Sequence, residues 1–234
     1  MQKSMAATLV AAFLATTANV GDRAFAASLN ISPVTLEVAA PQQATTLNLR
    51  NTGARPITGQ VRVFAWRQED GVDVLDPTDA VTASPPLVEV RPGVDYTIRV
   101  VRNLTAPVAA EETYRLVIDE VPDAAAREGG QVIVALRYSV PVFFVAPEAL
   151  TARVSWAIRH AKGKAVLVAH NDGERRIQVI DLAIGGKPIA RGLAGYVLGH
   201  SDRYWALPGN KAPANRNITA LSNKGPISGS ARAE

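Results

Sequence analysis

Three histidines are the residues whose types could most readily do chemistry in this chain. They are His160, His170 and His200, and none stands in a HExxH spacing or a similar ligand spacing. His200, Ser201 and Asp202 are contiguous, whereas the members of a catalytic triad converge from different segments, and neighbours on a strand point to opposite faces. We therefore expect no catalytic residue, no metal site and no enzyme.

Two further motifs are typical of turns. The acidic run "DVLDPTD" carries Asp73, Asp76 and Asp79, but it lacks the regular ligand spacing and the terminal Glu of a calcium loop. The run "GGKP" (Gly185 to Pro188) lacks the Ser or Thr of a phosphate loop and is typical of a hairpin turn. Because the chain has no cysteine, disulfides and thiolate metal sites are excluded. We expect no cofactor, and stability that comes from an apolar core.

The elements that would position these residues are short strands. Seven alternating segments in the first half are separated by breakers such as "NTGARP", "EDG" and "RPG". They are "LNISPVTLEV", "TTLNLRN", "GQVRVFAW", "PLVEV", "DYTIRVVRN", "YRLVIDEV" and "QVIVALRYSVPVFF". This pattern, without helical periodicity, predicts an all-β fold with a sandwich of immunoglobulin type. Trp66 lies in an alternating row and is expected to be core.

The second half predicts another, smaller β-sandwich after a link at "APEAL". Its strand-like segments are "RVSWAIRH", "KAVLVAHN", "RRIQVIDLAI", "GYVLG" and "RYWAL". The formal charge also changes here, from −5 over residues 28–150 to +8 over residues 151–234. We predict domains over residues 27–147 and 148–220, followed by a poorly ordered tail over residues 221–234.

The first residues predict export. Lys3 precedes an apolar run from Met5 to about Val20, and Ala24 and Ala26 have the spacing that a signal peptidase reads. We expect residues 1–26 to be a signal peptide and the mature chain to have no membrane span. The basic second domain lacks interleaved aromatic residues, so we expect no nucleic acid partner.

One predicted strand is unusually long. The stretch "GGQVIVALRYSVPVFFVAP" (Gly129 to Pro147) alternates over about twice the length of a typical strand. Val132, Val134, Leu136, Tyr138 and Val140 share one face of it. On the pattern alone, this could be an ordinary sandwich strand or one with length to spare for a partner.

Several segments together resemble the periplasmic chaperones of the chaperone-usher pilus pathway, the PapD type. They are "RVFAWRQEDG", "DPTDAVTASPPLVEVRPG", "IRVVRN", "YRLVIDEVP" and "LRYSVPVFFVAP", in matching order across Ser28 to Pro147. The ending "PVFF" is most similar to the archaic branch, which serves spore-coat-U-like subunits. "YVLGHSDRYWALP" resembles the motif of the second domain more loosely.

The resemblance implies two immunoglobulin-like domains in an L shape and a chaperone of the periplasm. Such a chaperone inserts a long strand into the open groove of a pilus or fimbrial subunit, which is donor-strand complementation. It then delivers the subunit to an outer-membrane usher without ATP. In this chain the subunit-binding row would be Val132, Val134, Leu136, Tyr138 and Val140. The free chaperone would be a monomer or a weak self-capping dimer.

The chain departs from the family where members hold the subunit's terminal carboxylate. Thr35 stands at the position of the family's first-strand Arg, and no lysine occurs between Lys3 and Lys162. A carboxylate anchor could instead come from Arg137, Arg102 or Arg99, because a guanidinium pairs with a carboxylate in two-point fashion.

Glu120 matches a family glutamate that helps to fix the angle between the domains, and Ala146 stands where its usual Arg partner would be. The alternative interpretation of the whole chain is a secreted two-domain pilus component or adhesin. That class predicts a self-complemented strand and stable polymers, whereas a chaperone predicts one-to-one complexes.

Overall fold

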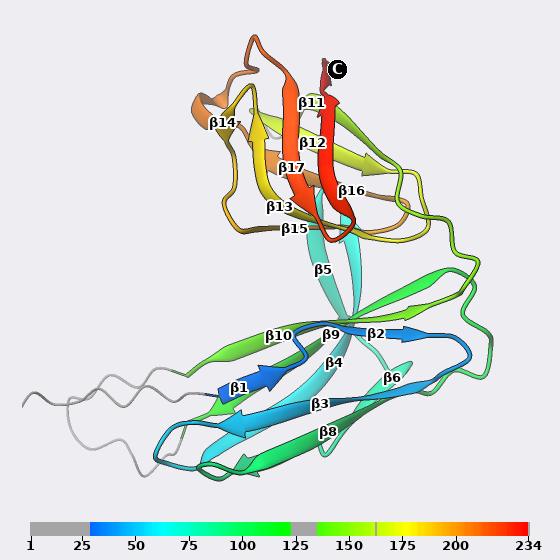
Figure 1. Ribbon diagram of the computed structural model, residues 1–234, viewed down its shortest axis with the longest axis vertical. Helices are drawn as coiled ribbons and strands as arrows, with labels where there is room; N and C mark the ends of the chain where they lie inside the picture. Colours follow the sequence, from blue (N-terminus) through cyan, green and yellow to red (C-terminus); the bar gives the residue numbers. More distant parts are fainter. Residues whose placement is uncertain (1–28, 123–134, 162, 234) are drawn as a thin grey trace, which may run out of the picture.

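The computed structural model describes residues 29–122, 135–161 and 163–233. The predicted signal peptide over residues 1–26 lies outside them. The described chain forms two β-sandwich domains in an L-shaped arrangement, with the first domain below and the second above in Figure 1. In the described part, no helix is long and apolar enough to cross a membrane.

The first domain is the predicted immunoglobulin-like sandwich of two sheets. One sheet has the order β1-β3-β8-β6; the other has the order β2-β10-β9-β4-β5, with β7 also paired to β4. The strands of the first sheet are β1 (Leu29–Ser32), β3 (Ala44–Asn51), β8 (Asp95–Arg102) and β6 (Val81–Ser84). Those of the second are β2 (Leu36–Ala39), β10 (Arg137–Val145), β9 (Glu111–Val121), β4 (Ile57–Glu69), β5 (Val72–Pro77) and β7 (Leu87–Val90).

Alternation of apolar and polar residues builds the core of this domain. On β3, Leu47 and Leu49 are fully buried, and the residues between and beside them are exposed. They belong to one apolar cluster with Leu116 and Ile118 of β9 in the facing sheet. Trp66 is only 2% exposed and belongs to the same cluster, as the sequence predicts.

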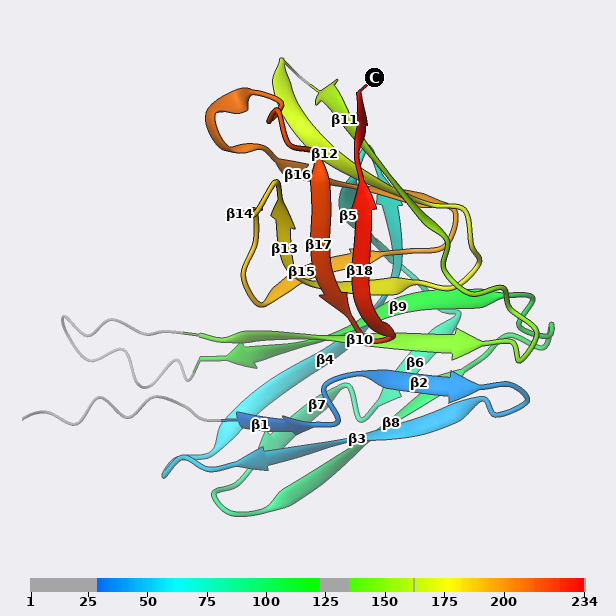
Figure 2. The same ribbon diagram turned by 45° about the horizontal axis from the view of Figure 1, so that its top comes forward.

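The stretch expected as one first strand is divided between the two sheets. β1 pairs antiparallel with β3, whereas β2 pairs in parallel with β10. Pro33 lies at the break, where its missing N–H removes a ladder hydrogen bond. As a result β2 runs beside only one part of β10 (Figure 2).

The second domain is a smaller sandwich with two sheets. Their orders are β16-β12-β11-β19 and β14-β13-β17-β18, with β15 also paired to β13. The strands are β11 (Val154–Ala161), β12 (Lys164–Asn171), β13 (Ile177–Ile184), β14 (Lys187–Pro188), β15 (Leu193–Val197), β16 (Ser201–Ala206), β17 (Asn217–Ser222), β18 (Gly225–Ser230) and β19 (Arg232–Ala233), with a short 3₁₀ turn η2 (Pro208–Asn210). Gly185 and Gly186 have φ of 56° and 78° in the β13–β14 turn, so "GGKP" is the predicted hairpin.

The prediction that residues 221–234 form a poorly ordered tail is wrong for the part of them that the structure describes, because most of these residues lie in strands. β18 pairs antiparallel with β17 along its whole length, so that Ser230 lies opposite Asn217 and Gly225 lies opposite Ser222. β19 pairs in parallel with β11. The glycines and Pro226 of β18 have low strand propensity, but pairing along β17 overrides it. These last strands therefore complete both sheets of the second domain.

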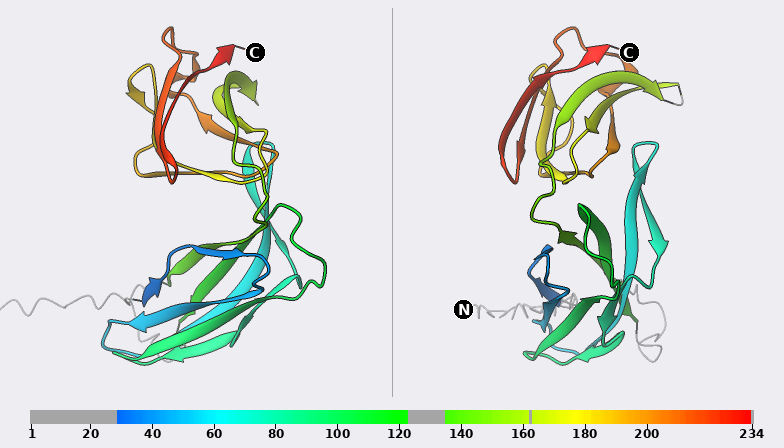
Figure 3. Two further views of the ribbon diagram at one scale, coloured as in Figure 1. Left: turned by 45° about the vertical axis from the view of Figure 1, so that its right-hand side comes forward. Right: turned by 90° about the vertical axis from the view of Figure 1, so that its right-hand side faces the viewer.

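The β4–β5 hairpin projects from the first domain and leans on the second (Figure 3). The Gln68 side chain donates from Nε2 to the Tyr196 carbonyl at 2.8 Å and accepts from the Leu198 N–H at 3.0 Å. At the hairpin tip, the Tyr204 N–H donates to the Gly71 carbonyl at 3.1 Å. Gly71 has φ of 74°, and a Cβ there would lie 2.1 Å from the Tyr204 ring, so only glycine fits this contact.

Candidate functional site

The two halves of β10 have different neighbours. β9 pairs with the whole strand from Arg137 to Val145. β2 pairs only from Val142 to Val145, so among the described strands none lies on the other side of residues 137–141. Pro141 suits such an edge because it has no N–H to pair. This half of β10 presents unpaired backbone groups that a further strand could use.

The apolar row of β10 passes from solvent into the core along the strand. Leu136 is 37% exposed, Tyr138 is half-buried, and Val140 is 4% exposed. Val140 belongs to the core cluster, where Tyr138 packs against it. The row of apolar side chains on β10 is therefore buried in the domain's core at Val140 and becomes exposed toward Leu136, beside the unpaired edge of the strand.

The predicted subunit-binding row is only partly available to a partner in this structure. Val132 and Val134 lie outside the described residues. The prediction for Val140 is corrected, because its side chain is buried in the domain's own core. It could contact a partner only if that core opened. Leu136 and Tyr138 are the predicted residues that remain accessible at the edge.

Arg102, predicted as a carboxylate anchor, already holds a carboxylate of its own domain. It donates from Nε and Nη2 to the two oxygens of Glu112 at 2.8 and 2.6 Å, and its side chain is 1% exposed. The hydrogen bond with Glu112 raises the pKa of Arg102 further. A second carboxylate has no access to this fork, so the prediction for Arg102 is corrected.

The other predicted anchor residues lie in three different places. Arg137 is exposed at the start of β10 and donates to Asp119 across the β9–β10 pair. Arg99 is exposed on β8, in the other sheet, opposite Thr46. Thr35 is half-buried in the bend between β1 and β2. The structure does not bring these residues together.

Asp119 is held ionised at the open end of β10. Burial opposes ionisation, but hydrogen bonds from Arg137 and Arg62 outweigh it and lower the pKa of Asp119. Both arginines are largely exposed. The open end of the sheet is therefore an ion-pair cluster beside the accessible apolar residues.

Arg115 is a cation that the sequence analysis missed. It lies on β9, with its guanidinium carbon 3.6 Å from the centroid of the Trp66 ring and 5.6 Å from that of Tyr196 in the second domain. Burial lowers the pKa of Arg115, and no described residue forms an ion pair or hydrogen bond with its side chain. Its position in "YRLVIDEV" gives no hint of this, because only the folded register places it opposite Phe64 and Pro141.

Two glutamates of the first domain, Glu37 and Glu111, form ion pairs with arginines of the second domain. Arg176 donates to Glu111 through its backbone N–H at 2.8 Å and also through Nη1, and both side chains are almost fully buried. Arg175 donates to Glu37 at 2.8 Å, and Arg176 also contacts Glu37. The guanidinium of Arg176 stacks 3.3 Å from the centroid of Phe143 on β10. The domain junction is therefore fixed at the end of β10 that carries Val145.

The prediction that Glu120 fixes the domain angle is wrong. Its carboxylate accepts from the Leu136 N–H at 3.3 Å, at the opposite end of β9 from Glu111. The motif places an acid correctly on β9, but the strand is long enough that its two ends face different surroundings. Glu111 takes the junction role because it lies beside Arg176 of the second domain.

His170 is the histidine with the most partners. Its Nδ1 lies 2.5 Å from Asp202 and its Nε2 lies 2.9 Å from Asp172. The hydrogen bond with Asp202 raises the pKa of His170, although partial burial opposes this. Ser155 pairs with His170 across the sheet, but Asp172 occupies the nitrogen that a nucleophilic serine would need. Within the described residues no cluster of ligands fits a metal ion.

The acidic run is partly strand rather than a solvated turn. Asp73 and Asp76 lie on β5, where Asp73 pairs with Arg203 of the second domain at 3.0 Å and Asp76 pairs with Arg67 at 2.8 Å. Asp79 lies in the turn before β6. The run therefore supports the hairpin and its contact with the second domain.

Comparison with known proteins gives one family match. The family described as pili and flagellar-assembly chaperone, PapD N-terminal domain, matches residues 28–151. No curated protein matches the chain.

Solved structures match over nearly the whole of both chains. A chain of the chaperone–tip adhesion subunit pre-assembly complex CsuC-CsuE, from archaic Csu pili of Acinetobacter baumannii, is 23% identical, with a TM-score of 0.74 over 88% of this chain and 99% of that chain. A chain of the Salmonella enterica SafA pilin complex with the SafB chaperone is 20% identical, with a TM-score of 0.65 over 87% and 96%. The Escherichia coli chaperone DraB is 19% identical, with a TM-score of 0.62 over 87% and 98%. At these identities the matches show the shared fold.

Proposed function

The chain belongs to the family of PapD-like pili and flagellar-assembly chaperones, and we propose that it is a periplasmic chaperone that captures an exported pilus subunit on the open edge of β10. The observation that carries this proposal is the unpaired backbone of residues 137–141 beside the exposed Leu136. A subunit that lacks one strand of its sandwich exposes a groove of unpaired backbone and apolar surface. β10 offers both complements at once.

In the proposed complex, the open half of β10 pairs with an edge strand of the subunit. Leu136 and Tyr138 enter the subunit's groove, together with Val132 and Val134, which are proposed from the alternation. Each large apolar side chain that becomes fully buried contributes about 1.5–3 kcal/mol. Ordering of the segment and of the subunit offsets part of this gain. Hydrogen bonds along the edge set the register, and the pockets set the choice of partner.

Arg115 is the cation that we assign to a subunit carboxylate in place of the corrected Arg102. It lies between the domains, no described carboxylate forms a direct ion pair with its guanidinium although the charge of Asp73 acts on it, and its guanidinium lies over the Trp66 ring. Burial makes a charged partner more favourable, because an unpaired guanidinium in a low-dielectric setting is costly. A chain terminus lying along β10 toward the second domain would reach this residue.

Release would require no nucleotide. The chaperone's strand is exchanged for an extension of the next subunit at the outer-membrane usher, and the exchange proceeds if the new strand completes the subunit fold better. The spore-coat-U-like class is the subunit class that we propose. The adhesin interpretation predicts a self-complemented strand, yet within the described residues no strand of this chain covers the open half of β10.

Co-expression with a candidate subunit in a periplasm tests the proposal. The tagged chain is purified as wild type, as Leu136→Asp, and as the control Leu87→Asp, which changes an exposed leucine on β7 of the same domain. We expect the subunit to co-purify one-to-one with wild type and Leu87→Asp and to be lost from Leu136→Asp. Co-purification with Leu136→Asp at the wild-type level would overturn capture by this edge.

Arg115→Gln and Arg115→Lys test the carboxylate contact separately. We expect the Gln variant to weaken capture by about tenfold, as loss of one charge-assisted pair should. Lys keeps the charge but loses the planar fork, so its capture should be intermediate. Equal capture by all three proteins would remove Arg115 from the site and leave the role of β10 standing.

A further inference from the structure

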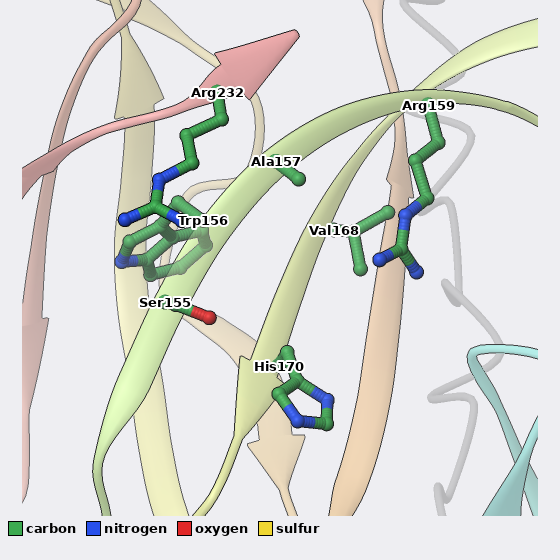
Figure 4. A pocket seen from close by; sticks show the side chains of 7 residues that line it. All are labelled: Ser155, Trp156, Ala157, Arg159, Val168, His170 and Arg232. Atoms are coloured by element: carbon green, nitrogen blue, oxygen red, sulfur yellow. The ribbon is translucent and has the colours of Figure 1, made fainter. Parts of the chain in front are cut away.

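A hollow on the outer face of the second domain combines basic side chains with an apolar floor (Figure 4). It lies on the sheet of β11, β12 and β19. Ala157 and Val168 belong to a separate apolar cluster on the face turned away from the main core, whereas Trp156 at the side of the hollow belongs to that core. Its volume is about 150 Å³. The residues that line it are Ser155, Trp156, Ala157, Arg159, Val168, His170 and Arg232.

The register of three strands brings these side chains together. Ala157 of β11 lies opposite Val168 on β12 and opposite Arg232 on β19. Arg159 and Ser155 lie two residues along β11 on either side of Ala157, so they share its face. In Figure 4 both guanidinium groups turn toward the end of the hollow that Ser155 and His170 line.

The charges in the hollow are unequally satisfied. Asp202 accepts from Arg159 at 3.2 Å and contacts His170 at 2.5 Å, and Asp172 contacts the other ring nitrogen of His170 at 2.9 Å, so both of these basic groups have acidic partners. Arg232 is exposed, and no described residue forms a hydrogen bond or an ion pair with its side chain. The hollow therefore has a guanidinium fork available to an anion.

The floor is apolar and small. Val168 is 1% exposed and Ala157 is 8% exposed, and they form a separate apolar cluster with Val166. A hydrated inorganic ion gains nothing from such a floor, whereas an alkyl group does. A cavity of about 150 Å³ accommodates a molecule of about six non-hydrogen atoms, the size of benzene.

We propose that this hollow is a binding site for a small organic carboxylate, with the carboxylate on Arg232 and its alkyl body on Ala157 and Val168. Ser155 lines the same hollow, and in the proposed complex its hydroxyl donates to the second carboxylate oxygen. The site is independent of the β10 edge, since it lies on the other domain. Two sources have this chemistry: a free short-chain acid and an acidic side chain of a partner protein.

Titration of the ¹⁵N-labelled chain with isobutyrate tests the site, with isobutyramide as the neutral isostere and sulfate as the inorganic anion. We expect isobutyrate to shift the amide resonances of residues 155–159 and 166–170 with a dissociation constant on the order of 1 mM. The amide should cause no such shifts, and sulfate should bind at least about tenfold more weakly because it cannot use the apolar floor.

Three variants locate the contact. Arg232→Ala should weaken isobutyrate binding by about tenfold, and Ala157→Leu, which fills the floor, should abolish it. Arg191→Ala is the matched control, an exposed arginine of the same domain outside the hollow, and should bind as wild type does. Unchanged binding by Arg232→Ala, shifts with the neutral amide, or equal binding of sulfate would each overturn the proposal.

A blocked peptide with one glutamate distinguishes the two sources. Binding tighter than that of isobutyrate, with the same loss in Arg232→Ala, assigns the hollow to an acidic side chain of a protein partner. Weaker binding assigns it to a free acid. Failure of all carboxylates to shift the resonances of the hollow would overturn the site, whatever the result of the subunit-capture experiment.

Discussion

The two halves of β10 share one strand, one partner in β9 and one alternating sequence, yet their surroundings differ. From Val142 to Val145 the strand lies between β9 and β2, and Phe143 and Phe144 are fully buried. From Arg137 to Pro141 it has β9 alone, and Leu136 before it is 37% exposed. The comparison teaches that a chaperone strand can be anchored by its own core at one end and remain available at the other.

The comparison predicts a graded response of the free chain's unfolding free energy to substitution along β10. The largest effect is expected from Phe144→Ala in the buried half. Phe144 is 0% exposed and packs edge-on against Tyr114, with ring centroids 6.1 Å apart. Removing the ring should destabilise the first domain by about 3–5 kcal/mol. Urea unfolding followed by circular dichroism measures this, and a loss below about 1 kcal/mol would contradict the anchoring role of this half.

The next largest effect is expected at the domain junction beside the buried half. Arg176→Ala removes the close partner of the buried Glu111 and leaves it only Arg175, whose Nε lies 4.0 Å from its carboxylate; this costs about 3 kcal/mol while the domains stay docked. Separation of the domains would rehydrate Glu111 and limit the loss, so the two domains should unfold as separate transitions. Calorimetry checks this, with Arg175→Ala as the milder control at a more exposed pair. A single wild-type transition in Arg176→Ala would contradict the junction described here.

A smaller, pH-dependent effect is expected at the open end. The pKa of Asp119 is lower in the folded chain than in the unfolded chain, so its pairs stabilise the fold above the unfolded pKa of about 3.9 and are lost as pH falls. The exposed Arg137 contributes about 0.2–1 kcal/mol. Wild type and Arg137→Gln should therefore differ at neutral pH and converge as the pH falls below the folded-state pKa of Asp119. A constant difference across this range would mean that charge pairing is not the cause.

The smallest effect on the free chain is expected from Leu136→Ala. Its side chain is already exposed, so the unfolding free energy should change by less than about 0.5 kcal/mol. The same substitution should weaken subunit capture, because the side chain then leaves a pocket unfilled. A large loss of stability without loss of capture would reverse the assignment of the two halves.

The alternating pattern was sufficient to predict most strands, because a half-buried strand has apolar and polar residues in alternation. β11, β12, β13, β15 and β16 all lie where their segments predict. β18 was missed because Gly225, Pro226 and Gly229 resemble a turn, and only pairing with β17 makes them a strand.

The candidate site was harder to predict because it depends on contacts between distant segments. Leu136 and Tyr138 follow from the alternation, but the burial of Val140 follows from its packing in the domain's own core cluster, which is built from distant strands. The roles of Glu111 and Arg176 depend on a contact 65 residues apart in the chain. Local pattern identifies an acid on β9, and only the register decides which end of that strand meets the second domain.

Hydrogen exchange of the β10 backbone amides, measured with and without a bound subunit, tests the central claim most directly. In the free chain, amides of residues 142–145 should exchange slowly, and those of residues 137–141 that do not bond to β9 should exchange fast. Binding of the subunit should slow exchange in residues 137–141 and leave residues 142–145 unchanged. A stable complex in which residues 137–141 still exchange as in the free chain would show that the subunit is held elsewhere.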